Sequence, residues 1–256
     1  MKEWNPELYL QFEAERTRPA RELLARIDHS DAKYISDLGC GPGNSTQLLY
    51  QAYPQSAITG VDSSETMLVQ AKQRLPSCRF QRADISTWQP DVAQDIIYAN
   101  ASLQWVSGHQ KLMPHLVQQL TDGGTLAFQV PDNLDQPSHA LMRKVAIDGQ
   151  WESKIGEDAF RSNRLLTTNA YYDLLSGCGC KVDTWRTTFY HVMPSVSAIV
   201  EWVRSTGLRP FLNPLHESEQ QEFLHMYLSE LEQAYGVRKD GNVLLAFPRL
   251  FVVAQR

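Results

Sequence analysis

The sequence lacks the features of secreted, metal-binding and membrane-spanning proteins. Its four cysteines are Cys40, Cys78, Cys178 and Cys180, and none has the Cys-x-x-Cys spacing of a zinc or redox site. We therefore predict free thiols, a reducing compartment and no bound metal. The first residues, Met-Lys-Glu-Trp-Asn-Pro, form no apolar signal core, and no apolar run is long enough to cross a bilayer. These absences predict a cytoplasmic protein that makes no membrane contact.

Basic charge is also scarce. The net charge is −5 and no block of the 256 residues is rich in Lys and Arg, so no nucleic-acid partner is expected. An acidic small-molecule substrate is compatible with this charge, because a pocket can be locally positive on an acidic protein. No Ser/His/Asp or Cys/His set stands out, so we predict no catalytic side chain. The length and the apolar fraction of 43% suit one large domain over residues 1–256.

Residues 33–44 are the most informative stretch. An apolar run predicts a buried strand that ends in a loop of three glycines, Gly39, Gly41 and Gly43. A helical pattern follows, so the loop joins a strand to a helix N-terminus, where free N–H groups meet ligands. A dinucleotide site needs Gly-x-Gly-x-x-Gly, but Asn44 occupies the last position. Asp37 before the glycines would repel a pyrophosphate, which favours a ligand that is cationic at this end.

The run Asp-Leu-Gly-Cys-Gly-Pro-Gly at 37–43 resembles the first motif of the class I S-adenosylmethionine-dependent methyltransferases. Their cofactor carries an ammonium and a sulfonium group and no phosphate, so an acid beside a glycine loop suits it. The resemblance implies S-adenosylmethionine as cofactor, S-adenosylhomocysteine as product and no metal, with Asp37, Gly39 and Gly41 at the cofactor. A glycine-rich turn of an unrelated α/β domain is the alternative interpretation.

A second acid follows at the end of the next predicted strand, residues 56–62. Asp62 lies 19 residues after Gly43, close to the offset of ~20 residues at which a carboxylate binds a ribose hydroxyl in nucleotide-binding βαβ units. We predict that Asp62 and the adjacent Ser63 bind the cofactor; the alternative is that Asp62 only caps the next helix. Met67, in the first turn of that helix, is placed either against an adenine or in the core.

Three further strands are predicted at residues 79–85, 95–101 and 123–130. The resemblance implies that Asp84 binds the adenine amino group and that Ile85 flanks the base. Asn100, at the end of the next strand, is a further cofactor candidate. Strands alternating with helices, and ligand candidates at the strands' carboxyl ends, are typical of a doubly wound sheet.

The second half adds a long strand at 181–193 and a last strand at 249–255, with helical residues 195–240 between them. The predicted fold is therefore α/β: a doubly wound, Rossmann-like sheet of seven mostly parallel strands, with a helical cap inserted at about 195–240. Two helix starts are predicted from capping boxes, one at Asn44 with Gln47 and one at Ser218 with Gln221.

Further segments resemble the trans-aconitate-methylating branch of the same family over essentially the whole chain. They are Trp4-Asn-Pro, Asn100-Ala-Ser-Leu-Gln-Trp105, Trp185-Arg-Thr-Thr-Phe-Tyr-His191, Thr206-Gly-Leu-Arg-Pro210 and Ala246-Phe-Pro-Arg-Leu250. The resemblance implies methyl transfer to one carboxylate of trans-aconitate, which gives a monomethyl ester. A carboxylate with a pKa near ~4 is ionised at neutral pH, so this reaction needs no general base.

A tricarboxylate partner must be held by hydrogen-bond donors, preferably arginines. We predict that it is bound by Arg16, Gln104, Arg186, Tyr190, Arg209 and Arg249. For each arginine taken alone, the alternative is a surface ion pair; as a group, we expect at least two to contact substrate. The sequence does not indicate the oligomeric state.

Other functions remain open at this stage. One alternative is a malonyl-carrier-protein O-methyltransferase or another small-molecule methyltransferase. A nucleic-acid amino-methyltransferase is disfavoured, because Asn100-Ala-Ser-Leu replaces the Asn/Asp-Pro-Pro-aromatic motif of those enzymes. A binding module without turnover is disfavoured by the intact acids Asp37, Asp62 and Asp84.

Overall fold

The computed structural model describes residues 17–160, 165–204 and 206–256, apart from the side chain of Asp158. The chain divides into two compact units. Unit 1 contains Met1–Pro131, Arg164–Arg186 and Leu250–Arg256. Unit 2 contains Asp132–Asn163 and Thr187–Arg249, and so includes the predicted helical insertion at 195–240 together with an earlier segment.

Seven strands of the described residues form one sheet in the order β3-β2-β1-β4-β5-β7-β6. The strands are β1 (Tyr34–Leu38), β2 (Ala57–Asp62), β3 (Arg79–Arg82), β4 (Gln94–Asn100), β5 (Leu120–Pro131), β6 (Lys181–Met193) and β7 (Val243–Gln255). β1 to β5 pair in parallel. The predicted doubly wound, mostly parallel sheet is confirmed. The chain moves outward from β1 to β3 and then returns to β4, so the strand order reverses between β1 and β4, where ligands bind in such sheets.

β7 runs antiparallel to β5. The Gly123 N–H donates to the Arg256 carbonyl at 3.0 Å, and the Asp132 N–H donates to the Pro248 carbonyl at 2.9 Å. β7 is one strand through Pro248 and begins at Val243, six residues before the predicted start. Pro248 has no N–H to donate, but its carbonyl still accepts a hydrogen bond, so the strand continues through it.

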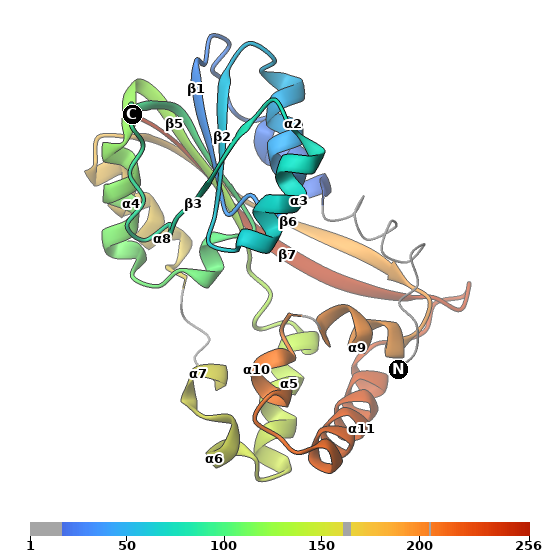
Figure 1. Cartoon of the computed structure of the whole chain (residues 1–256). Helices are drawn as coiled ribbons and strands as arrows, with labels where there is room; N and C mark the ends of the chain where they lie inside the picture. The colour runs from blue at the N-terminus through green and yellow to red at the C-terminus, as the bar shows by residue number, and fades with distance from the viewer. Residues whose placement is uncertain (1–16, 161–164, 205) are drawn as a thin grey trace. The chain divides into compact units, whose positions relative to one another are not determined.

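Helices cover both faces of the sheet in unit 1 (Figure 1). α2 (Asn44–Ala52) and α3 (Glu65–Arg74) lie on one face, and α4 (His109–Gln118) and α8 (Thr168–Gly177) lie on the other. In the core beneath α4 and α8, strand residues such as Ile97 and Phe128 belong to one hydrophobic cluster with Leu116 of α4 and Tyr171 of α8. Because both faces are covered, the central strands are apolar almost throughout.

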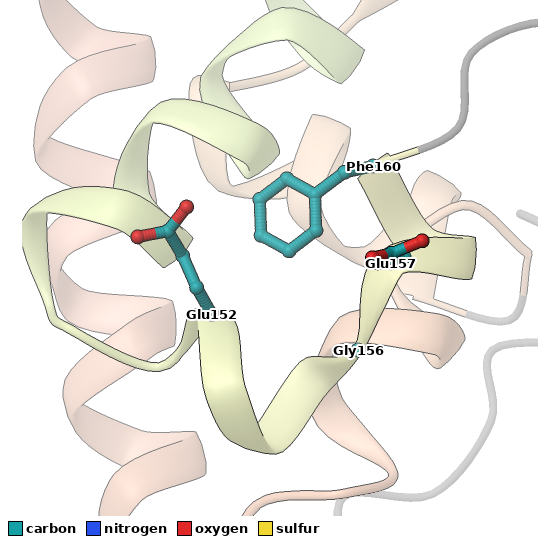
Figure 2. A pocket seen from close by; sticks show the side chains of 4 residues that line it. All are labelled: Glu152, Gly156, Glu157 and Phe160. Atoms are coloured by element: carbon teal, nitrogen blue, oxygen red, sulfur yellow. The ribbon is translucent and has the colours of Figure 1, made fainter.

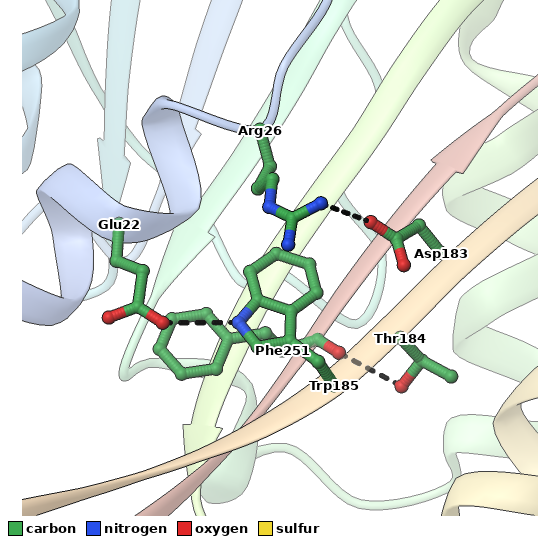
Figure 3. Close-up of polar contacts among 6 residues, drawn as sticks. All are labelled: Glu22, Arg26, Asp183, Thr184, Trp185 and Phe251. Atoms are coloured by element: carbon green, nitrogen blue, oxygen red, sulfur yellow. Dashed lines mark hydrogen bonds and ion pairs between the residues drawn. The ribbon is translucent and has the colours of Figure 1, made fainter.

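A helical segment at 17–24 leads to residues that contact β6 (Figure 3). The Trp185 ring stacks on Phe251 with centroids 4.9 Å apart, and the Arg26 guanidinium carbon lies 4.9 Å from the Trp185 ring centroid. The Trp185 indole N–H donates to Glu22 at 3.1 Å, and Arg26 pairs with Asp183 at 3.4 Å. This stacked group attaches the start of the described chain to the edge strand of the sheet.

Unit 2 is built from helices and the outer parts of β6 and β7. Its helices are α5 (Pro137–Asp148), α6 (Glu152–Ile155), α7 (Glu157–Phe160), α9 (Val196–Arg204), α10 (Arg209–Leu212) and α11 (Glu217–Ala234). α11 packs against α5 and α9. The buried Tyr227 hydroxyl donates to the Ser138 carbonyl, while the Ser138 N–H donates to the Tyr235 hydroxyl. None of the described helices is both long and apolar enough to cross a membrane.

Both predicted capping boxes are wrong. α2 has Gly43 as its N-cap, in the left-handed conformation and without a side-chain cap. α11 has His216 as its N-cap, and the box is completed by Glu219 rather than by Ser218 and Gln221. The Glu219 carboxylate accepts from the His216 N–H at 3.1 Å, so the predicted chemistry is present but begins two residues earlier.

Candidate active site

The glycine loop at the carboxyl end of β1 has a backbone that only glycine adopts without strain. Gly39, Gly41 and Gly43 have φ values of +72°, +53° and +89°. A Cβ on Gly39 would lie 2.2 Å from the Ser102 Cβ, whereas a Cβ on Gly41 would meet no atom of the described residues within 4 Å. Gly39 therefore permits close packing against the segment after β4, and Gly41 borders open space.

Asp62, at the end of β2, holds this loop from the side. One carboxylate oxygen accepts from the Gly41 N–H at 2.9 Å, and the other accepts from the Ser64 N–H at 2.8 Å. Ser64 is the N-cap of α3, with its hydroxyl accepting from the Met67 N–H at 3.4 Å. Asp62 is thus more than a helix cap, because it joins β2, the glycine loop and the start of α3. Ser63 is exposed beside it.

Asp37 is fully buried beneath the loop. Its Oδ2 accepts from the Ser45 and Thr46 hydroxyls of α2 at 2.7 and 2.6 Å, and its Oδ1 has no hydrogen-bond partner among the described residues. Asp37 therefore attaches the start of α2 to the end of β1. The sequence prediction missed the roles of Ser45 and Thr46, although two hydroxyls directly after the loop were a usable signal.

Burial raises the pKa of Asp37 from 3.8 to about 6, against the lowering effect of the two hydroxyl hydrogen bonds. Between these two pH values the folded protein binds a proton that the unfolded chain has released. The contribution of Asp37 to the free energy of unfolding is therefore present at low pH and lost as the pH rises through about 6. At neutral pH the loop contains a buried negative charge that a cationic ligand would stabilise.

The segment after β3 contains the residues predicted to bind adenine. β3 ends at Arg82, so Asp84 lies beyond the strand and not within it as predicted. The Asp84 side chain is exposed, and it accepts from the Ser86 hydroxyl at 2.7 Å and the Ser86 N–H at 2.8 Å; these bonds lower its pKa. Ile85 Cδ1 lies 3.6 Å from the position of a Cβ on Gly39. Ile85 thus lies beside the glycine loop as an apolar wall.

Residues 101–106, here called the post-β4 turn, lie against the glycine loop. The Ser102 hydroxyl donates to the Leu38 carbonyl at 2.6 Å. Ala101 has a φ of +52°, which is uncommon for a residue other than glycine and indicates backbone strain at this position. Asn100, just before the turn, accepts from the buried Gln129 amide at 2.6 Å. The ends of β1 and β4 therefore meet at a strained, tightly held turn.

The same turn contains the short helix η1 (Leu103–Trp105). The Gln104 amide nitrogen donates to the Ala101 carbonyl at 2.7 Å, and the Gln104 Oε1 is buried without a hydrogen-bond partner among the described residues. The Trp105 side chain is 60% exposed, and the Met67 side chain, in the first turn of α3, is 40% exposed. Neither large side chain is core filler, which was the alternative interpretation of Met67.

The chain is 55% identical to trans-aconitate 2-methyltransferase of Yersinia pestis over 254 residues, which cover 99% of this chain and 98% of the relative. It is 54% identical to trans-aconitate 2-methyltransferase of Acidovorax ebreus, covering 100% and 99%. The chain belongs to the trans-aconitate 2-methyltransferase family. The predicted resemblance is confirmed, and a model of the methyltransferase domain matches residues 35–124.

Solved structures agree with this fold. An S-adenosylmethionine-dependent methyltransferase from Mesorhizobium loti superposes with a TM-score of 0.52 at 19% identity, covering 94% of this chain and 98% of that one. The family match from 35 to 124 spans the glycine loop, Asp62, Asp84 and the post-β4 turn. These residues include those predicted to bind S-adenosylmethionine, the cofactor of this family, and their roles stay predictions.

The predicted substrate-binding residues of the family member are distributed over both units. Gln104 and Arg186 belong to unit 1, whereas Tyr190, Arg209 and Arg249 belong to unit 2. Arg186, Tyr190 and Arg209 are exposed, but Arg249 is only 6% exposed, with its guanidinium carbon 5.0 Å from the Phe247 ring centroid. Arg16 lies outside the described residues. Their roles at the substrate remain predictions.

A pocket of about 400 Å³ lies in unit 2, at α6 and α7 (Figure 2). It is lined by Glu152, Gly156, Glu157 and Phe160. Two carboxylates beside a phenyl ring disfavour an anionic ligand, so this pocket does not suit the polycarboxylate of the family's reaction. Within the described residues, no group of three or more His, Cys, Asp and Glu side chains is arranged to hold a metal ion.

Proposed function

We propose that the protein transfers the methyl group of S-adenosylmethionine to a carboxylate of trans-aconitate or a close polycarboxylate. The observation that carries this proposal is the 55% identity over 99% of the chain, because it extends through unit 2 as well as through the generic glycine loop. A similarity confined to residues 35–124 would have supported only the cofactor.

The residues of unit 1 fit S-adenosylmethionine by their chemistry. Gly41 borders open space beside the loop, so a ligand can approach the backbone there. We propose that the Asp62 carboxylate, which accepts two backbone N–H bonds, also binds ribose hydroxyls. We propose that Asp84 and Ile85 bind the adenine, that Met67 covers it, and that Ser63 and Asn100 complete the cofactor site.

The cofactor has positive charge where the loop is negative. Asp37 Oδ1 is buried and has no described hydrogen-bond partner, and its negative charge at neutral pH favours the ammonium and sulfonium groups. A pyrophosphate ligand would instead be repelled. We propose that Asp37, Gly39 and Gly41 form the cationic end of the site.

The chemistry requires alignment rather than acid–base catalysis. The bound cofactor supplies an activated methyl group, and an ionised substrate carboxylate is already a nucleophile. The protein must hold the carboxylate oxygen in line with that methyl group and exclude water. Alignment of the reacting groups can lower the barrier by about 7–11 kcal/mol. We propose that the post-β4 turn, with Gln104 and Trp105, fixes the acceptor side of the site.

The proposal is tested by assaying methyl transfer to free trans-aconitate, cis-aconitate and citrate, and to a malonyl-carrier protein. We expect turnover on trans-aconitate and little on the carrier. Turnover only on the carrier-bound acid would assign the malonyl-carrier-protein activity instead. Calorimetry with S-adenosylhomocysteine is combined with these assays. Binding of S-adenosylhomocysteine without methyl transfer to any of these acceptors would indicate a binding module without turnover.

Two sets of variants test the division of roles. Asp62→Ala should weaken S-adenosylhomocysteine binding, while Arg186→Ala and Arg209→Ala should raise the KM for trans-aconitate and leave cofactor affinity nearly unchanged. Both arginines are exposed, so neither substitution removes core packing. Equal weakening of cofactor binding by all three variants would contradict the proposed roles.

A further inference from the structure

His109, the first residue of α4, is 1% exposed and makes hydrogen bonds through both ring nitrogens. Its Nε2 lies 3.0 Å from the Leu103 carbonyl and 3.0 Å from the Val106 carbonyl. Its Nδ1 lies 2.6 Å from the hydroxyl of Tyr171 on α8, which is also fully buried. Nothing in the proposed reaction so far uses this pair.

The partners determine where the protons are. Carbonyl oxygens only accept, so Nε2 carries the hydrogen and donates to Leu103 and Val106. In the neutral ring Nδ1 is then an acceptor, and the Tyr171 hydroxyl donates to it. Burial lowers the pKa of His109, which favours this neutral form. The result is a directed chain of donors from α8, through α4, to the post-β4 turn.

The end of that chain is the segment beside the glycine loop. The two carbonyls that accept from His109 belong to the post-β4 turn, whose Ser102 donates to the Leu38 carbonyl. The turn also contains the strained Ala101 and the exposed Trp105. A turn with a strained residue retains one position only where its surroundings fix it. The Ser102 hydroxyl and the His109 ring both fix this turn.

We propose that His109 is a positioning residue for methyl transfer, which together with Tyr171 holds the post-β4 turn in the place where the acceptor carboxylate is aligned. The inference rests on the proposed function, in that the turn is taken to be the acceptor side of the site. His109 acts through the turn and touches neither cofactor nor substrate.

His109→Leu removes the donor and His109→Gln retains an N–H donor in a similar position. We expect His109→Leu to lower kcat about tenfold or more, since small misplacements of reacting groups cost up to ~100-fold, with the S-adenosylhomocysteine dissociation constant within about twofold of wild type. His109→Gln should restore most of the kcat. The kcat of each variant is measured with trans-aconitate as substrate, at a temperature well below that at which the variant unfolds.

His115→Leu is the matched control, because His115 lies on the same helix and its Nε2 hydrogen-bonds the Trp88 carbonyl at 2.8 Å. It should lower the unfolding temperature without the fall in kcat. If His109→Leu lowers stability as His115→Leu does and leaves kcat unchanged, or if His109→Gln restores nothing, the role is only structural and the inference is wrong.

Tyr171→Phe decides the case if His109→Leu does not fold, because it removes one oxygen and keeps the buried ring. It should lower kcat by a smaller factor and speed amide hydrogen exchange in residues 101–106 more than in residues 39–43. Unchanged kcat and unchanged exchange would overturn the inference. The exchange measurement needs no substrate. If the wild-type protein failed to methylate trans-aconitate, the proposed function would be refuted, but the effect of Tyr171→Phe on exchange in residues 101–106 could still be measured.

Discussion

Substituting Gly39 and Gly41 separately tests the geometry of the loop, because the two residues share a left-handed backbone but face different surroundings. In Gly39→Ala the new Cβ would lie 2.2 Å from the Ser102 Cβ and 2.9 Å from the Ser102 Oγ. In Gly41→Ala it would meet no atom within 4 Å in the part of the chain that the structure describes. The comparison therefore isolates steric overlap from backbone strain.

The expected loss of stability follows from three contributions. A left-handed alanine costs about 1–2 kcal/mol, and overpacking costs about 1–3 kcal/mol. The restricted unfolded chain of an alanine returns about 0.4–1 kcal/mol. We expect Gly39→Ala to lower the free energy of unfolding by about 3 kcal/mol and Gly41→Ala by about 1 kcal/mol.

Urea unfolding of the cofactor-free protein measures both values, provided that the m-values agree with wild type. A second variant, Gly39→Ala/Ser102→Gly, removes the Ser102 Cβ and should be less destabilised than the sum of its two single substitutions. Equal losses for Gly39→Ala and Gly41→Ala, or strict additivity in the double variant, would refute the contact between the glycine loop and the post-β4 turn.

Gly39→Ala should cost more folding stability than Gly41→Ala, but Gly41→Ala should cost more ligand affinity. In the proposed site the cofactor lies beside Gly41, so a Cβ there would occupy room that the cofactor needs, whereas its expected effect on the cofactor-free fold is small. Gly41→Ala should therefore weaken S-adenosylhomocysteine binding by calorimetry far more than its loss of stability suggests. Wild-type affinity in Gly41→Ala would place the ligand elsewhere.

Three further predictions concern single side chains. Asp37→Asn should raise the free energy of unfolding of the cofactor-free protein by up to about 3 kcal/mol at about pH 8, because the pKa shift to about 6 penalises the ionised form there. Urea unfolding as a function of pH should show this gain fading as the pH falls from about 6 to 3.8; a gain that grows on acidification would contradict the sign. Trp105→Ala should change the KM for trans-aconitate. Because the side chain is 60% exposed, the unfolding temperature should stay within a few degrees of wild type; a large loss of stability would show instead that Trp105 packs in the core. Arg249→Ala should lower the unfolding temperature clearly, as expected for a side chain that is 6% exposed, whereas Arg209→Ala should not; circular dichroism melts compare the two.

The sequence predicted the parts of the site that follow from local patterns. Apolar runs gave the five parallel strands, and the acids Asp37 and Asp62 could be placed at strand ends because the strand pattern stops there. The positive φ of Gly39 and Gly41 also follows from residue type, since glycine adopts it without strain. Each of these features depends on a few neighbouring residues.

Helix starts were predicted poorly for a physical reason. Asn44 is a better N-cap by residue preference, but the left-handed Gly43 already turns the chain into α2. Ser45 and Thr46 then direct their hydroxyls to Asp37 instead of capping the helix. For α11, His216 is an unusual N-cap, so a search for Ser, Thr, Asp or Asn selected Ser218. In both cases a nearby contact outweighed the statistical preference.

The arrangement around the post-β4 turn was beyond sequence analysis because its hydrogen bonds join distant segments. Ser102 bonds to Leu38, 64 residues away, and Tyr171 bonds to His109, 62 residues away. No periodicity or spacing reports such pairs, and each residue taken alone has an ordinary structural interpretation. The sequence therefore located the turn through Asn100 and Gln104 but not the groups that hold it.

The buried acid and the tight turn have complementary physical effects on the site. Asp37 places an unfavourable negative charge beneath the loop, where a cationic ligand lowers its free energy. The post-β4 turn is held by hydrogen bonds from the Ser102 hydroxyl and the His109 ring, which form without any ligand. In the proposed site, cofactor binding would thus be favoured by relief of an electrostatic cost, while the acceptor side would be aligned before the substrate binds. For a reaction whose nucleophile is already ionised, rigid alignment is the contribution that the protein must make, and in the proposed mechanism the fixed post-β4 turn supplies it.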